Sequence, residues 1–137
     1  MKLQTIRNLS VALLAASTLF AQEPQRLKFE VPFGFHVGDK ILPSGMYTLE
    51  TNTVGNMMRV RSVDCKASAM TLSNAIGPSA TPHQARLIFT RYGEQYFLSE
   101  VWPLDIGGRA LLKTKLEKEQ AVATHSRDRE VIILAAR

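Results

Sequence analysis

Residues 86–102 read RLIFTRYGEQYFLSEVW and contain the strongest structural signal in the chain. Two runs rich in β-branched and aromatic residues, 86–91 and 95–102, flank Tyr92-Gly93-Glu94. Runs of this kind joined by a short glycine-containing loop are typical of a β-hairpin. We therefore expect two adjacent antiparallel strands here, the second of which ends at Trp102-Pro103.

A second β pattern precedes this hairpin. Residues 26–37 (RLKFEVPFGFHV) place six apolar side chains at odd positions, which is the period of a strand face. Pro32 lies on the opposite face and has no N–H for a ladder. The segment therefore predicts an edge strand, or two short strands that meet at a bend near Pro32-Phe33. His36 falls on the polar side, where a surface histidine is expected.

The other elements follow from shorter patterns. Further strands are expected at 46–51, 57–63, 66–72 and 131–134, separated by turns at 38–40, 42–45, 52–56, 64–66 and 107–108. The last of these strands has a frayed apolar tail as its alternative. Residues 73–84 contain Gly77-Pro78 and Thr81-Pro82 and are expected to form a loop. Residues 110–123 contain neither Gly nor Pro and predict a helix with Leu112 and Leu116 on its apolar face.

These elements together predict a mainly β fold. We expect a small antiparallel β-sandwich or β-barrel of six or seven strands, with one short C-terminal helix. Residues 22–137 are expected to form a single domain, which is long enough to fold without disulfides or metals.

The N-terminus is typical of a secretory signal peptide. Lys2 and Arg7 precede the uncharged run 9–20 (LSVALLAASTLF), which is too short to span a membrane. We expect cleavage after Ala21, with a site near Thr18 as an alternative. The competing interpretation is an uncleaved anchor or a buried N-terminal helix. A cleaved signal peptide implies export to the periplasm or the medium. Its removal would leave the mature protein without a stable membrane anchor.

Charge and cysteine content narrow the function classes. Cleavage removes Lys2 and Arg7 and lowers the formal net charge from +5 to +3, which is too mild to indicate nucleic-acid binding. Cys65 is the single cysteine, so the domain does not depend on an internal disulfide. An unpaired thiol in a turn is the simplest interpretation of Cys65, with an intermolecular disulfide or a reactive thiol as alternatives.

Motifs for catalysis or for a cofactor are not evident. His36, His83 and His125 lack a second ligand at metal spacing, and no cofactor fingerprint is present. No Gly-x-Ser-x-Gly sequence surrounds any serine. Glu94 and Glu100 are expected to face solvent rather than to act as a catalytic pair. Catalytic residues are therefore not assigned.

A basic and aromatic binding surface is one hypothesis. Its members would be Arg59, Arg61, Arg86, Arg91, Tyr47, Tyr92, Tyr96 and Trp102, with Arg109 nearby. An anionic polysaccharide or another envelope component suits an exported protein better than a nucleic acid. Scattered arginines more often solvate strand faces. The phenylalanines and Trp102 could line a ligand cavity, but a packed core is the simpler interpretation.

Two motifs carry a resemblance. The first is F-x-V-P-F-x-F-x-V-G-D-K at 29–40, followed by L-P-S-G-x-Y at 42–47, and the second is YFLSEVW at 96–102. This pattern resembles a group of small secreted proteins of Acidobacteria. The resemblance implies secretion and assigns no reaction, ligand or site residue.

Three functional hypotheses remain open. The leading one is a non-enzymatic envelope or extracellular β module that binds a partner. The second is a small hydrolase or isomerase whose site is assembled from residues distant in sequence. The third is a structural subunit that assembles through an exposed strand edge.

Overall fold

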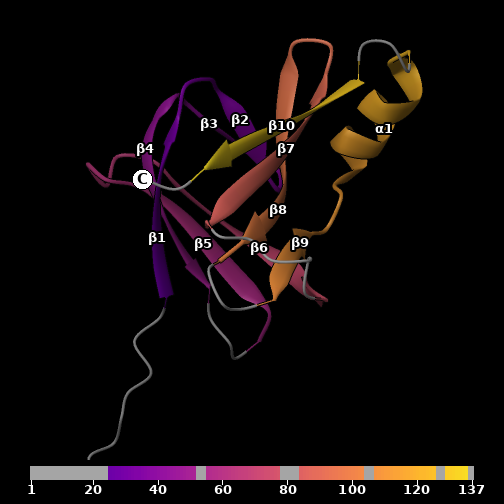
Figure 1. Ribbon diagram of the computed structural model, residues 1–137. Coiled ribbons are helices and arrows are strands. Elements are labelled where there is room, and N and C mark those ends of the chain that lie inside the picture. Colours follow the sequence, from indigo (N-terminus) through magenta and orange to yellow (C-terminus); the bar gives the residue numbers. More distant parts are fainter. Residues whose placement is uncertain (1–24, 52–54, 78–83, 104–106, 126–128, 136–137) are drawn as a thin grey trace, which may run out of the picture.

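The computed structural model describes residues 25–51, 55–77, 84–103, 107–125 and 129–135. In these residues the chain forms ten strands and one helix (Figure 1). The first six strands are β1 (Gln25–Val31), β2 (Phe35–Val37), β3 (Lys40–Leu42), β4 (Gly45–Thr51), β5 (Met57–Ser62) and β6 (Ser68–Ile76). The remaining elements are β7 (Arg86–Tyr92), β8 (Gln95–Trp102), β9 (Gly108–Leu111), α1 (Lys115–Ala123) and β10 (Arg129–Ala135).

The strands form one sheet in the order β1-β4-β5-β6-β9-β8-β2-β3, and β7 and β10 extend it from the other edge of β8. Strands β2 and β9 share one edge of β8, because β9 pairs at Glu100 and Val101 and β2 pairs at Phe97. The β2–β3 hairpin therefore fills the space beside the short β9, where it lies against β6.

The sheet curves around one core. Its two end strands, β1 and β10, approach each other, although no ladder joins them within the described residues. On β5, Met58 and Val60 point inward and Arg59 and Arg61 alternate outward. The core takes residues from both halves of the sheet, with Phe29, Phe35, Tyr47, Leu49, Phe89 and Val101 among its most buried members.

The predicted fold class is confirmed, since the chain is mainly β with one short helix near the C-terminus. Ten strands are described, more than the six or seven expected. Strands β3 and β9, of three and four residues, were missed, whereas β1 and β2 match the alternative of two short strands that meet at a bend near Pro32-Phe33. The parallel β2–β8 contact also departs from the expected all-antiparallel arrangement.

Two element boundaries were wrong. Residues 73–76 belong to β6 rather than to a loop, because they pair with β9 along the whole of that strand. Ala110 and Leu111 belong to β9, so α1 begins five residues later than the expected helix. Its N-cap is Thr114, whose hydroxyl accepts the N–H of Glu117. Tertiary pairing outweighs local propensity at both places.

The remaining expectations either agree with the structure or concern residues outside the described ranges. The hairpin at 86–102 and the final strand at 131–134 are confirmed as β7–β8 and part of β10. Residues 1–24, 52–54 and 78–83 lie outside the described residues, so the signal peptide, part of the 52–56 connection and His83 stay predictions. No helix in the described part of the chain is long and apolar enough to cross a membrane.

Strand β8 is buried on both faces. Leu98 and Val101 enter the core, whereas Phe97 and Trp102 are buried outside it. A register shift opposite Ile88 and Phe89 leaves Ser99 unopposed, which allows two adjacent pairs of β8 residues to be buried. Trp102 lies directly against Gly108 of β9, where an added Cβ would come within 2.6 Å of the indole ring.

We therefore expect Gly108→Ala to destabilise the protein by about 1–3 kcal/mol, because the indole ring and β9 would have to move apart. Urea unfolding followed by the fluorescence of Trp102, the single tryptophan, measures this change. Gly77→Ala is the matched control, since a Cβ there meets nothing within 4 Å. Equal stability of the two variants would contradict the packing argument.

Candidate binding surface

The outer side of β5, β6 and β9 carries exposed apolar side chains next to one another. Met70 and Leu72 on β6 are 54% and 49% exposed, and Leu112, directly after β9, is 47% exposed. Leu72 pairs with Met57 of β5, and its carbonyl oxygen accepts the Leu112 N–H at 3.4 Å. Directly paired residues share one face of a sheet, so these four side chains lie together.

Arginines border this apolar group. Arg59 is paired with Met70 and Arg61 with Ser68 in the β5–β6 ladder. We call the set Met57, Arg59, Arg61, Met70, Leu72 and Leu112 the β6 face. Contiguous exposed apolar side chains with a polar border are typical of protein interaction sites, and Met and Arg are enriched there.

The charge of the β6 face is only partly balanced within the chain. The Arg59 guanidinium lies 3.9 Å from a Glu50 carboxylate oxygen, and Glu50 also pairs with Arg26 at 3.2 Å. Among the described residues, no carboxylate lies within ion-pair distance of Arg61. The face is therefore apolar at its centre and cationic along β5.

The arginines of the predicted basic and aromatic surface do not gather in one place. Arg59 and Arg61 lie on β5, whereas the Arg86 guanidinium is 5.5 Å from the centre of the Trp102 ring on β8. Arg91 pairs with Glu130 at 2.7 Å. Arg109, the further arginine, lies on β9 and donates a hydrogen bond to the side-chain oxygen of Asn56, just before β5.

The aromatic members of that predicted surface serve packing. Tyr47 is 1% exposed, and its hydroxyl donates to the carbonyl oxygen of Pro43. Tyr96 stacks on Phe33 with ring centres 4.0 Å apart. Trp102 is buried and its indole N–H donates to Glu100 at 2.7 Å, so Glu100 is half-buried rather than wholly solvent-facing. Glu94 is exposed as expected.

The expectation of a surface histidine at position 36 is wrong. His36 is 8% exposed and stacks on Phe97, with ring centres 4.3 Å apart. The short β2 lies against β8, so the polar side of its pattern is covered as well. Burial lowers the pKa of His36, and its Nδ1 atom has no hydrogen-bond partner among the described residues.

A buried carboxyl group lies at the next aromatic ring. Tyr92 contacts Phe97 and is 2% exposed, and its hydroxyl donates to Glu117 of α1 at 3.3 Å. Burial raises the pKa of Glu117, and the positive charges of Lys113 and Arg129 oppose that shift. The Arg129 guanidinium lies 5.3 Å from the centre of the Tyr92 ring. Sequence reasoning missed Glu117, although Thr114 and Glu117 have the spacing of a capping box.

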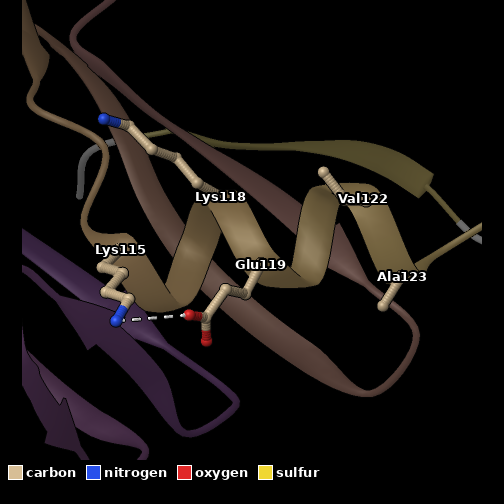
Figure 2. Close-up of a pocket in the computed structure, with 5 residues that line it drawn as sticks. All are labelled: Lys115, Lys118, Glu119, Val122 and Ala123. Carbon is tan, nitrogen blue, oxygen red and sulfur yellow. Dashed lines mark ion pairs between the residues drawn. The ribbon is translucent and has the colours of Figure 1, made fainter.

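A shallow hollow of about 450 Å³ lies on α1 (Figure 2). Its lining residues are Lys115, Lys118, Glu119, Val122 and Ala123, and Lys115 pairs with Glu119 at 3.9 Å. All five come from one helix, so the hollow does not bring together groups from different elements as a catalytic site does.

The remaining candidate residues are the single cysteine, Cys65, and the potential metal ligands. Cys65 is exposed at a turn where its φ of 61° is left-handed, which confirms the expected turn. Asp64 holds this turn through Ser62 Oγ at 2.6 Å and the Lys66 N–H at 3.1 Å. His125 is exposed. No group of three potential metal ligands occurs in the part of the chain that the structure covers.

Compared with known proteins, the chain matches no family model, no curated protein and no solved structure.

The lowered pKa of His36 predicts acid sensitivity. The unfolded state takes up a proton near pH 6.5 and the folded state does so only at lower pH, so stability falls as the pH drops through this window. We expect His36→Phe, which keeps the ring stack on Phe97, to remove the part of this acid-induced loss of stability that His36 causes. Urea unfolding of both proteins from pH 8 down to pH 5 tests it. A constant difference in unfolding free energy across that range would disprove it.

Proposed function

We propose that this chain is an exported, non-enzymatic β module that recognises a component of the cell envelope or of the extracellular medium through the β6 face. The apolar run after Lys2 and Arg7 supports export. The observation that carries the binding role is the exposure of Met70, Leu72 and Leu112, each about half exposed and next to one another. Burying such a group against a partner is favourable by about 25 cal/mol per Å² of apolar surface.

The charges on β5 favour one class of partner. Two copies that met through their β6 faces would bring Arg59 and Arg61 of both chains, and no carboxylate of these faces, into one interface, and like charges at an interface disfavour association. A protein surface with an apolar centre and flanking carboxylates would match both features. The β6 face is built from strands, whereas peripheral insertion into a lipid layer more usually uses an amphipathic helix.

The enzyme hypothesis has one observation in its favour. Glu117 and His36 are buried near Tyr92, and burial shifts their pKa values in opposite directions. A screen for hydrolysis and isomerisation with the wild-type chain and Glu117→Gln tests it. Turnover that disappears in this isosteric variant would favour an enzyme over the binding module.

The double variant Met70→Gln, Leu72→Gln tests the proposed surface. Both side chains are exposed, so the fold should tolerate the change, while partner capture from envelope and secreted fractions should fall at least about tenfold. The matched control is Val131→Gln, Ile133→Gln on β10, where the apolar side chains are 61% and 60% exposed. Quantitative mass spectrometry of each captured species gives the readout. Equal losses in both variants, or no specific species with the wild type, would reject the proposal.

The double variant Arg59→Gln, Arg61→Gln tests the charge of the partner. We expect weaker binding of the same captured species and a smaller loss of binding between low and high salt, because two cationic contacts are gone. Arg26→Gln is the control, since this exposed arginine lies on β1 and pairs with the same Glu50. Unchanged salt dependence in the double variant would show that the partner is not acidic.

A further inference from the structure

An ordinary surface helix turns its apolar side chains towards the protein, whereas α1 turns mainly polar side chains towards it. The residues that it turns towards the protein are Glu117, Gln120, Ala121 and Thr124, at the spacing of one helical face. Glu117 is the one buried side chain of α1. In contrast, Leu116 is 40% exposed and Val122 is 89% exposed. The docked face of the helix therefore carries no large apolar side chain.

Little else holds α1 against the sheet. Figure 1 shows it beside the β7–β8 hairpin, and its backbone comes close to the strands at few points. Among the described residues, the side-chain hydrogen bond that joins α1 to the hairpin is the one that Tyr92 donates to Glu117. A nine-residue helix is marginal in water without tertiary packing, and segments with few buried contacts open at low free-energy cost.

We propose that α1 is a detachable strap, which the protonated Glu117 holds over Tyr92 on the outer side of β7–β8 and which is released when Glu117 loses its proton. A neutral carboxyl group is cheap to bury beside a phenol, whereas a carboxylate pays a desolvation cost there. After release of α1, the Glu117 carboxylate is hydrated. Release also uncovers Tyr92, whose hydroxyl contacts Glu117.

The groups around Glu117 determine whether docking of α1 strengthens or weakens as the pH rises. Tyr92 faces it from β7, Arg129 acts on it from β10, and Lys113 acts from the segment before the helix. Lys113, the hydrogen bond that Tyr92 donates, and Arg129 all favour the carboxylate and so limit the effect of burial. Burial outweighs them and raises the pKa of Glu117 from its ordinary value of 4.5. Glu117 therefore binds its proton more tightly in the docked helix than in the released helix. Docking weakens as the pH rises from 4.5 through the higher pKa of the docked Glu117.

His36 acts in the opposite direction. It lies on β2 and is separated from Tyr92 by the Phe97 ring. Burial lowers its pKa, so acid destabilises this region below about pH 6.5. Any measurement on α1 must separate the two groups, and the Glu117 and His36 variants do so.

Hydrogen exchange of the backbone amides of 119–123, corrected for the intrinsic effect of pH, tests the strap. In the full chain we expect protection to fall as the pH rises from 4.5 to 8, by up to about tenfold per unit while Glu117 deprotonates. Glu117→Gln, which keeps the hydrogen bond to Tyr92, should give protection that does not change with pH. His36→Phe should leave the fall in place.

Glu119→Gln is the matched control, because Glu119 lies on the same helix, is exposed and pairs only with Lys115 at 3.9 Å in the described chain. It should retain the pH dependence of the wild type. Protection of β7 and β8 serves as an internal measure of folding and should stay high in every variant. Constant protection of α1 in the wild type, or a pH dependence that persists in Glu117→Gln, would overturn the proposal.

Discussion

Strand β8 is covered on both faces and paired along both edges, and this constraint organises the rest of the molecule. One edge takes β7, and the other is divided between β2 and β9. On the inner side Leu98 and Val101 contribute to the core, while Phe97 and Trp102 are covered from outside by His36 and Gly108. The outer side chains of β8 are thus buried by residues of the two strands that share its edge, β2 and β9.

The sequence predicted the parts of the fold whose signals are local. Alternation at 26–37 and the glycine-containing loop at 92–94 identified β1, β7 and β8, because side-chain period and turn chemistry act between near neighbours. Strands β3 and β9 were missed. β3 has only three residues between two expected turns, and β9 forms only where β6 and β8 lie beside it. The end of β6 was missed for the same reason, because Ser73–Ile76 forms a strand only where β9 is available.

The candidate site was less predictable than the fold. Arg59 and Arg61 were correctly placed together on an outward strand face, but the apolar centre beside them requires the β5–β6 register and the path of the chain after β9. Tyr47, Tyr92 and Trp102 looked available for binding because aromatic side chains serve surfaces and interiors alike. Their burial follows from tertiary packing, as does the burial of His36. A residue's face can be predicted from period two only where the opposite face meets water.

The meeting of β1 and β10 has a consequence for how the chain acquires its structure. The first and the last strands of the described chain approach each other without forming a ladder. A contact between residues so far apart in sequence forms only after a long stretch of chain has been ordered, which slows folding. The gap beside β1 also stays open until residues 129–135 are available to form β10. The sheet therefore cannot close around its core while β10 is missing.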